Sequence, residues 1–417
     1  MKAIERCRIC GNEKLIEILN LGDQELTGVF PSPGESVGGG ELSLVKCSGN
    51  DSCGLVQLKY SFDLDKMYGN NYGYRSGLNP SMVDHLTSIV REVEGKYSLD
   101  DDDLVIDIGS NDGTTLSKYN NRKLDFVGMD PTGVKFRKYY PNDVELFADF
   151  FSAQNVVKIR DTKKAKVITS IAMFYDLEAP ISFARDIESV LDEEGVWIFE
   201  QSYLPAMIDT VSYDTICHEH LEFYCLKQID YIVEHSGLKV IDVVRNEVNG
   251  GSFRVTAAKK SSHYPVSQNV FDMREFESKG GYDELKTYED FSRIVENNRT
   301  NLREFIDREV ENGKKILGYG ASTKGNVTLQ YCNITNEEIP AIADVNEDKY
   351  GCVTPATHIP IISEEEAWRM KPDYFLVLPW HFRDFILDKE RDKIRETGCK
   401  FVFAFPKLEI VGPEDLN

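Results

Sequence analysis

The stretch "DLVIDIGSNDG" at residues 103–113 limits the possible folds more than any other part of this chain. A short apolar run that ends in a glycine-containing turn and leads into a helical pattern predicts a β-strand followed by a helix. Apolar residues with helical spacing precede it at 80–94, and further apolar runs follow at 124–131, 165–170 and 194–201, with helical stretches between them. This alternation is typical of a doubly wound parallel sheet.

The last third of the chain repeats the pattern. A long amphipathic helical region at 282–315 precedes the apolar runs "KILGYGAS", "IPAIADVN", "YFLVLPW" and "KFVFAF". The first sixty residues are instead rich in Cys, Gly and turn residues, a composition that suits a small metal-stabilised module. We therefore predict an α/β protein with a metal-binding module at 1–70, a central Rossmann-like domain at 71–265 and a C-terminal Rossmann-like α/β domain at 266–417.

Size and charge restrict the classes of partner. With 417 residues, of which 41% are hydrophobic, the chain can bury substantial cores. The formal net charge of -22 disfavours nucleic acid and anionic lipid as partners. No run of eighteen apolar residues and no leader pattern is visible, so we expect no membrane association and a cytoplasmic location. The nine cysteines are an odd number and argue against a disulfide framework.

Four of the cysteines have the spacing of metal ligands. Cys7 and Cys10 form "CRIC", and Cys47 and Cys53 lie in "CSGNDSC". Thiolates at such knuckles close a tetrahedral shell around a structural zinc ion. The second pair has five intervening residues rather than the usual two to four, which leaves Asp51 as an alternative ligand. Buried free thiols are the other interpretation of these cysteines.

The turn after the strand at 103–108 has the features of a cofactor site. Asp107 ends the strand, Gly109 and Gly113 allow the backbone to approach a ligand closely, and Asn111 and Asp112 line the turn. A dinucleotide site would instead have the pattern G-x-G-x-x-G to bind a pyrophosphate. The polar turn therefore favours a ligand that carries an amine and hydroxyl groups.

Residues at the ends of the following strands fit the rest of such a ligand. Asp130 lies twenty-three residues after Asp107, where an acid commonly accepts hydrogen bonds from ribose hydroxyls. Asp149 and Phe150 of "ADFF" are expected at the amine and the ring face of an adenine, and Ser170 at the next strand end. In this order the residues predict S-adenosylmethionine as cofactor. An ordinary Rossmann-like sheet with solvated acids is the alternative.

The segment "YDTICHEHLEFYC" at 213–225 concentrates groups that take part in chemistry. His218 and His220 flank Glu219, and Tyr224 follows. A joint metal site is disfavoured because residues two apart point to opposite sides of a strand and diverge on a helix. A structural histidine pair and an acid/base site remain as interpretations of this segment.

Motifs along nearly the whole chain, in order, resemble those of the three-domain sugar C-methyltransferases. They are "CRICGN", "CGLVQL", "YGYRSGLNP", "VIDIGSNDG", "YDTICHEH", "GGSFR" and "GYGASTKGN". The resemblance implies an N-terminal zinc-binding module, a central class I methyltransferase domain and a C-terminal Rossmann-like domain, with the active site between the last two. It also implies a nucleotide-linked ketosugar as substrate and His220, the last histidine of its motif, as the catalytic base.

The residues fit that chemistry. Methylation next to a ketone requires a base that removes a C–H proton and donors that stabilise the resulting enolate. Histidine is suited to the first task because its ordinary pKa of roughly 6.5 leaves it largely neutral at cellular pH. We expect Glu219 to orient His220 or to bind sugar hydroxyls, and Tyr224, Tyr72 and Tyr74 to face the oxyanion. His218 is assigned to substrate binding or structure.

The glycine-rich turn "GYGASTKGN" opens a helix of the second α/β domain, where backbone amides and Lys324 are expected to bind the diphosphate of a sugar nucleotide. A turn that serves packing alone is the alternative. Arg75, Ser76 and Asn79 are further predicted contacts of the substrate, and Trp380 or His381 of "LPWHF" are expected near the same face. Gly250 and Gly251 are expected to bend the chain into an edge strand.

The chain departs from the family pattern at two positions of this region. Cys217 replaces a tyrosine that many members have before H-E-H, and Tyr175 replaces a histidine after the fourth strand. The main functional hypothesis is methylation of carbon next to the ketone of a nucleotide-linked, dTDP-linked 4-keto-deoxysugar. An O- or N-methyltransferase and an inactive ligand-binding homologue are the alternatives.

Overall fold

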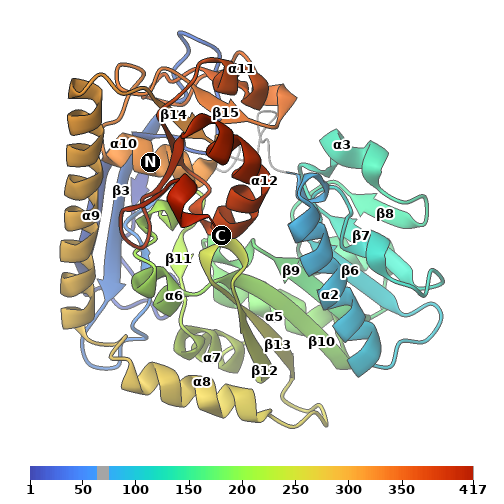
Figure 1. The fold of residues 1–417 in the computed structure, drawn as a ribbon. Helices are drawn as coiled ribbons and strands as arrows, with labels where there is room; N and C mark the ends of the chain where they lie inside the picture. Colours follow the sequence, from blue (N-terminus) through green and yellow to red (C-terminus); the bar gives the residue numbers. More distant parts are fainter. Residues whose placement is uncertain (63–74, 417) are drawn as a thin grey trace.

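The computed structural model of the chain describes residues 1–62 and 75–416, and these residues form four β-sheets surrounded by helices (Figure 1). The predicted domain boundary at 70 and 71 lies outside the described residues, and the three-part division with its boundaries stays a prediction.

The central sheet has the strand order β12-β13-β10-β9-β6-β7-β8. Strands β6 to β10 are parallel, and β13 is antiparallel to both β10 and β12. The bounds are β6 (Leu104–Ile108), β7 (Asp125–Met129), β8 (Val144–Phe147), β9 (Ala165–Ile171), β10 (Leu191–Ser202), β12 (Leu238–Asn246) and β13 (Ser252–Lys259). Each apolar run predicted as a strand in this region is a strand. The expected edge strand after Gly251 is wrong, because β13 lies between two neighbours.

Both faces of the central sheet are covered, which explains why its strands consist of continuous apolar runs. On β10, Val196 and Ile198 face the core formed with α2 (Pro80–Lys96), whereas Trp197 and Phe199 face the core on the opposite side. Residues of β10 alternate between the two cores because successive side chains of a strand point to opposite faces. The second core includes α4 (Ala153–Arg160), α5 (Pro180–Val190), α7 (Leu226–Glu234) and α8 (Gln268–Lys279).

The N-terminal sheet is antiparallel, with the order β11-β4-β3-β2. Its strands are β2 (Leu15–Glu25), β3 (Gly39–Cys47), β4 (Val56–Leu58) and β11 (Glu222–Phe223). Strand β11 follows directly after the H-E-H segment, so that segment is attached to the N-terminal sheet. A separate pair is formed by β1 (Lys2–Ala3) and β5 (Tyr60–Ser61).

The C-terminal sheet has the order β16-β15-β14-β17-β18-β19 and is parallel except for β19. The strands are β14 (Ile316–Tyr319), β15 (Ile342–Asp344), β16 (Ile361–Ser363), β17 (Tyr374–Val377), β18 (Lys400–Phe403) and β19 (Glu409–Val411). The helices of this region are α10 (Thr323–Tyr331), α11 (Glu364–Arg369) and α12 (Arg383–Thr397). The four predicted strands of this region are confirmed as β14, β15, β17 and β18.

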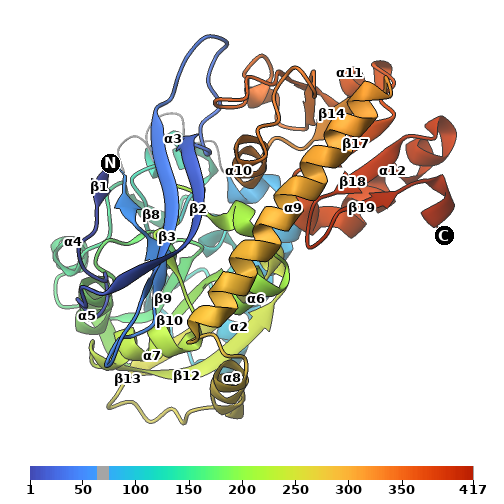
Figure 2. The same ribbon diagram turned by 90° about the vertical axis from the view of Figure 1, so that its left-hand side faces the viewer.

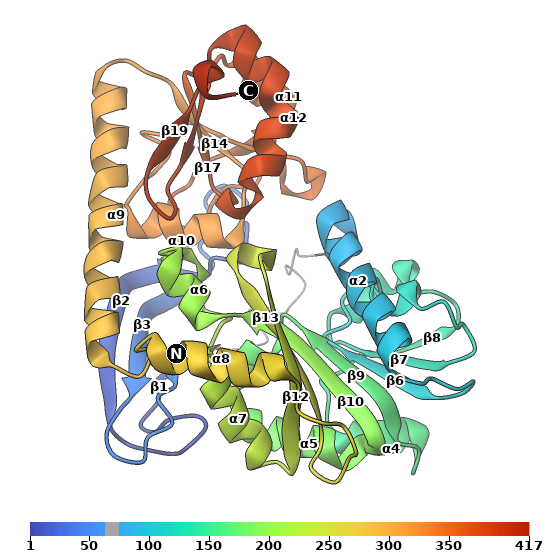
Figure 3. The same ribbon diagram turned by 60° about the horizontal axis from the view of Figure 1, so that its bottom comes forward.

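The long helix α9 (Leu285–Glu311) connects two of the sheets. It runs along the N-terminal sheet and the C-terminal sheet in both rotated views (Figures 2 and 3). Its buried residues recur at helical spacing, from Tyr288 and Phe291 to Phe305 and Ile306. The short helices α3 (Gly133–Phe136) and α6 (Leu204–Asp209) complete the fold.

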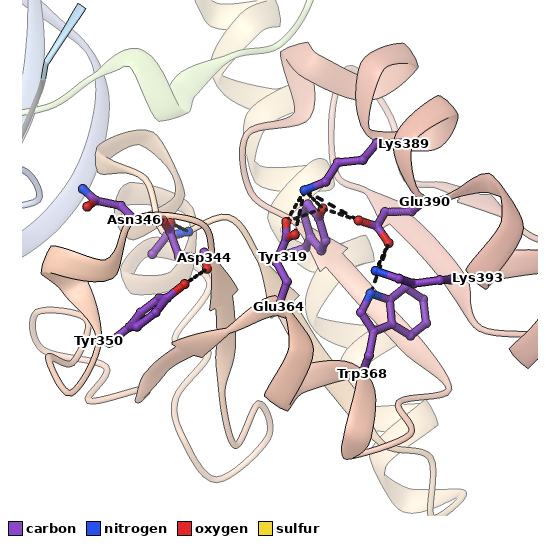
Figure 4. A network of polar contacts seen from close by, with 10 residues as sticks. Tyr319, Asp344, Asn346, Tyr350, Glu364, Trp368, Lys389, Glu390 and Lys393 are labelled. Atoms are coloured by element: carbon purple, nitrogen blue, oxygen red, sulfur yellow. Dashed lines mark hydrogen bonds and ion pairs between the residues drawn. The ribbon is translucent and has the colours of Figure 1, made fainter. Parts of the chain in front are cut away.

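A buried carboxylate ties α12 to the C-terminal sheet (Figure 4). Glu390 is fully buried and accepts hydrogen bonds from Tyr319 Oη at 3.0 Å and Trp368 Nε1 at 3.1 Å. Lys393 Nζ lies 3.0 Å from its Oε2. These donors compensate the cost of burying the charge, so the network holds the strand that precedes the glycine-rich turn.

No helix among the described residues is both long and apolar enough to cross a membrane.

Candidate active site

The four cysteines predicted as metal ligands meet in space. Their Sγ atoms all lie within 4.8 Å of one another, and the pairs Cys7–Cys53 and Cys10–Cys47 are 3.5 Å apart. A tetrahedron with zinc–sulfur bonds of about 2.3 Å places its sulfurs roughly 3.8 Å apart, so the cluster fits one zinc ion. Asn12 Nδ2 lies 3.2 Å from Cys47 Sγ and supports that thiolate. Four protein ligands leave no open position, so the ion is structural.

The alternative ligand Asp51 is not part of this cluster. In the part of the chain that the structure describes, these cysteines are the only group of three or more potential ligands that converge. The H-E-H segment therefore forms no such group.

The turn after β6 is held by hydrogen bonds to its own polar residues. Asn111 lies in the left-handed region with φ of 51°, and its N–H donates to Asp130 Oδ2 at 2.8 Å. The segment before α2 closes over this turn, because Ser76 N–H donates to Asn111 Oδ1 at 3.0 Å and Gly77 N–H donates to Asp112 Oδ2 at 3.0 Å. A Cβ at position 77 would lie 2.6 Å from Asp112 Oδ2, so a larger residue than glycine there would have to displace that carboxylate.

Asp130 retains capacity for a ligand. Its Oδ1 accepts from both the N–H and the hydroxyl of Thr132 at 2.6 Å, and its Oδ2 accepts from Asn111. A carboxylate oxygen has two lone pairs, so Oδ2 can accept one further donor, such as a ribose hydroxyl. Burial raises the pKa of Asp130, although its hydrogen bonds oppose that effect.

Asp107 is more enclosed than Asp130. It is 3% exposed, and its Oδ1 accepts from the Thr169 hydroxyl at 2.5 Å. Burial raises the pKa of Asp107 to about 7. The carboxyl group thus supports the turn from within the sheet, and a role in binding an ammonium group stays a prediction. Gly109, with φ of 70°, follows it and lies against Met173.

The remaining predicted cofactor contacts differ in their surroundings. Asp149 and Phe150 are exposed after β8, where Asp149 Oδ1 accepts from the N–H of Phe150 at 2.7 Å. Ser170 is fully buried, and its hydroxyl accepts a hydrogen bond from Trp197 Nε1 at 2.9 Å. Ser170 lies inside β9, and the hydroxyl points into the core, so we correct its assignment as a cofactor contact.

Two predicted site residues near α2 lie outside the described residues. They are Tyr72, a predicted substrate contact, and Tyr74, a predicted catalytic residue. Arg75 lies beside the cofactor turn, with Nε 3.5 Å from Asp112 Oδ2 and its guanidinium 4.1 Å from the ring centre of Tyr139. Asn79 is the N-cap of α2 and accepts from the N–H of Ser81 at 3.0 Å. The amide of Asn79 thus has a structural role here.

His220 has the geometry of a general base. Its Nδ1 lies 2.8 Å from the carbonyl oxygen of Thr215, so Nδ1 carries the proton and Nε2 has a free lone pair. Burial lowers the pKa of His220 to about 4, which keeps the ring neutral at cellular pH. The ring of Tyr175 lies against it, with the ring centres 4.3 Å apart.

Glu219 reaches toward the N-terminal module. A Cβ added at Gly28 would lie 2.4 Å from Glu219 Oε1 and 3.8 Å from Thr323 Oγ1. The other carboxylate oxygen, Oε2, is buried without a hydrogen-bond partner. Burial raises the pKa of Glu219, and a hydrogen bond with Cys217 opposes that shift. The carboxyl is therefore positioned where all three parts of the chain meet.

Two predicted site residues point elsewhere. His218 is fully buried against the N-terminal sheet, with Nε2 3.4 Å from the carbonyl oxygen of Gly40 and its ring edge-on to Phe62. Tyr224 is fully buried and stacked on Phe174. Burial raises the pKa of Tyr224 well above its ordinary value. We correct the substrate-binding assignment of His218 and the catalytic assignment of Tyr224, since neither side chain is accessible to a substrate in this structure. The structural role considered for His218 fits its burial.

A second polar set faces His220 from the C-terminal region. Lys324 Nζ donates to the carbonyl oxygen of Asn249 at 2.6 Å. Asp214 is fully buried and accepts from Trp380 Nε1 at 2.8 Å. His381 follows Trp380, and both lie against Gly250. The H-E-H segment, the turn at 248–250, the start of α10 and the turn after β17 thus converge.

Sequence reasoning does not identify some of these residues. Thr132 and Tyr140 hold the cofactor turn, the latter by donating to the carbonyl oxygen of Asn111 at 2.8 Å. No local pattern marks Tyr140. Asp214 lies within the segment at 213–225, which is rich in titratable residues. An acid in such a segment is a candidate site residue, and this signal could have identified Asp214.

Three protein-family models match successive parts of the chain. They are described as "Putative zinc binding domain" over residues 7–68, "Methyltransferase domain" over 85–243 and "C-methyltransferase C-terminal domain" over 247–406. The chain is therefore similar to the three-domain C-methyltransferases over most of its length. It is an S-adenosylmethionine-dependent methyltransferase, and S-adenosylmethionine and structural zinc are its cofactors.

Individual proteins are similar to the whole chain or to part of it. The C-methyltransferase NovU of Streptomyces niveus is 28% identical over 418 residues, which cover 99% of this chain and 98% of NovU. Among solved structures, a S-adenosylmethionine-dependent methyltransferase from Clostridium acetobutylicum has a TM-score of 0.32 at 15% identity and covers 42% of this chain and 90% of its own. The CcbJ methyltransferase of Streptomyces caelestis has a TM-score of 0.32 at 11% identity, over 42% and 89% of the two chains.

Proposed function

We propose that this methyltransferase acts on the carbon next to the ketone of a nucleotide-linked, dTDP-linked 4-keto-deoxysugar, in the formation of a branched deoxysugar. The full-length similarity to a C-methyltransferase supports carbon as the acceptor. The observation that carries the mechanism is the hydrogen bond between His220 Nδ1 and the carbonyl oxygen of Thr215, because it directs a basic Nε2 away from the backbone.

In the proposed reaction, Nε2 of His220 takes the proton from the carbon next to the ketone. The electron pair of the broken C–H bond forms the C=C bond of the enolate, and the carbonyl π pair moves onto the ketone oxygen. S-adenosylmethionine supplies the methyl group when it is bound beside the turn at 109–113. A positioned general base contributes about 10²- to 10⁴-fold to such a reaction. The lowered pKa of His220 keeps the base ready at neutral pH, and the enolate charge stabilises the imidazolium formed.

The test replaces the base and follows the sugar directly. His220→Asn is expected to abolish both methyl transfer and the exchange of the sugar C–H with deuterium from solvent, with S-adenosylhomocysteine binding retained. Exchange is measured by NMR on a series of nucleotide 4-ketosugars. Retained turnover in this variant would exclude His220 as the base. The chemical shift of the transferred methyl carbon distinguishes C-methylation from O- or N-methylation.

A further inference from the structure

Lys324 is a partly buried cation without a carboxylate partner in direct contact among the described residues. Its Nζ has a hydrogen bond to the carbonyl oxygen of Asn249 at 2.6 Å, and no ion pair within 4 Å involves it among the described residues. Burial lowers the pKa of Lys324. An ammonium group in this environment is costly unless it has further partners, and it retains two N–H donors for them.

The groups around Lys324 show what those donors face. Lys324 is the charged group that lowers the pKa of His220, and it also lowers the pKa of His381. Asp214 and Cys217 act in the opposite direction and raise the pKa of Lys324. Helix α10 packs against the turn at 213–215, and the carbonyl oxygen of Thr215 in that turn holds His220, so these elements place the ammonium group and the proposed base in one polar region.

Asp214 is held in this polar region by Trp380. Its Oδ2 accepts from Trp380 Nε1 at 2.8 Å, whereas its Oδ1 is buried without a hydrogen-bond partner. Lys324 counteracts the rise that burial causes in the pKa of Asp214. A buried carboxylate and a partly buried ammonium group stabilise each other's charged forms even without direct contact.

An enolate needs a donor at its oxygen, and two of the described side chains in the segment at 213–225 are poorly suited to that role. The Tyr224 hydroxyl is enclosed in another core, and burial raises the pKa of the Cys217 thiol well above its ordinary value. A cation directed at a developing negative charge in a buried site stabilises that charge more strongly than a neutral hydroxyl or thiol does.

We propose that Lys324 is a catalytic residue that donates a hydrogen bond to the enolate oxygen, and that Asp214, held by Trp380, is a positioning residue that keeps Lys324 protonated. This inference rests on the proposed function. As the C–H bond breaks, its proton forms an N–H bond at His220 Nε2, and its electron pair becomes the C=C bond while the carbonyl π pair moves to the oxygen. The ammonium group of Lys324 neutralises that charge.

This role differs from the diphosphate contact that the sequence predicts for Lys324. A diphosphate contact acts equally in the ground state and the transition state, so its loss raises KM alone. An enolate contact strengthens only as the proton leaves, so its loss lowers kcat and the exchange rate.

The experiment measures deuterium exchange at the sugar carbon of a nucleotide 4-ketosugar, by NMR, with the full chain saturated with S-adenosylhomocysteine. Lys324→Met is expected to lower the exchange rate about 10²- to 10³-fold, with the KM of the ketosugar and the Kd of S-adenosylhomocysteine little changed. Lys324→Arg, which keeps the charge, is expected to recover part of the rate. Lys400→Met, a surface control beside Glu414, leaves the rate unchanged.

Asp214→Asn tests the positioning residue through the pH profile of exchange. The negative charge of Asp214 raises the pKa of Lys324, so its loss lowers that pKa, and the alkaline loss of activity is expected at lower pH than in the wild type. An unchanged alkaline limb contradicts the role of Asp214.

Two outcomes overturn the assignment of Lys324. One leaves the proposed function intact, and the other excludes it. If Lys324→Met raises KM while exchange at saturation is unchanged, Lys324 contacts the diphosphate and not the enolate. If the wild type catalyses no exchange with any nucleotide 4-ketosugar, the proposed function itself fails, and the inference fails with it. Retained S-adenosylhomocysteine binding shows that Lys324→Met is folded.

Discussion

At the scale of single residues, burial decides how each histidine of the H-E-H segment behaves. His218 is fully buried and His220 is partly buried, and burial lowers the pKa of both rings to about 4. The two differ in what they face, because His220 lies beside Tyr175 and the polar region, whereas His218 contacts the backbone of β3 through the carbonyl oxygen of Gly40. The same residue type, two positions apart, is thus a candidate base in one case and part of a core in the other.

The lowered pKa of His218 predicts a dependence of stability on pH. As the pH falls, His218 binds a proton in the unfolded chain, where its pKa is roughly 6.5, before it does so in the folded chain. The contribution of the neutral ring to folding stability is therefore fully present above pH 6.5 and is lost as the pH falls toward 4. His218→Phe is expected to reduce the drop in Tm between pH 7.5 and pH 5, measured by thermal unfolding. His358→Asn, at an exposed position with φ of 54°, is the matched control. Equal drops in wild type and His218→Phe contradict the prediction.

At the scale of elements, the two Rossmann-like sheets use the same device at their glycine-containing turns. Asp130 follows β7 and accepts the N–H of Asn111, and Asp344 ends β15 and accepts the N–H of Ala321 at 2.7 Å. In each sheet the acid comes from the strand next to the one that carries the turn. A strand-end carboxylate thus fixes a tight turn that the strand alone would leave with unpaired N–H groups.

The cysteine cluster leads to a prediction about how zinc joins separate elements. Cys7 and Cys10 precede β2, Cys47 ends β3, and Cys53 precedes β4, so one ion joins three segments of a small sheet. We expect about one zinc ion per purified chain, measured by elemental analysis. Cys47→Ser is expected to lose the metal and to lower the Tm, because the module has few other cross-links. Cys399→Ser, a buried cysteine outside the cluster, is expected to keep it. Metal-free wild type would contradict the assignment.

At the scale of the whole molecule, the candidate site exists only because distant parts of the chain are packed together. Strand β11 attaches the H-E-H segment to the N-terminal sheet, and α9 joins that sheet to the C-terminal one. Asn326 of α10 donates to the carbonyl oxygen of Thr27 at 2.8 Å, next to Gly28. The zinc-binding module therefore helps to form the candidate active site as well as its own sheet.

Gly28 tests that conclusion. A Cβ at this position would lie 2.4 Å from Glu219 Oε1, so Gly28→Ala must displace the carboxyl group. We expect kcat for methyl transfer to fall about tenfold to a hundredfold, while S-adenosylhomocysteine binding in the central domain is unchanged. Gly95→Ala on α2, where nothing lies within 4 Å of the added Cβ, is the control. If both variants have wild-type kcat, the N-terminal module does not shape the site.

The sequence by itself determined the features that depend on local pattern. Apolar runs predicted β6, β7, β9 and β10 of the central sheet and β14, β15, β17 and β18 of the C-terminal sheet. The spacing of the cysteines predicted their cluster, and the sequence motifs indicated the family. Only the tertiary structure decided which side chains share a pocket. Asp214 and Trp380 are 166 positions apart, and the burial of Ser170, His218 and Tyr224 depends on partners from other segments. Local propensity specifies strands and turns, whereas the direction and the charge of a side chain depend on packing between elements that are remote in the sequence.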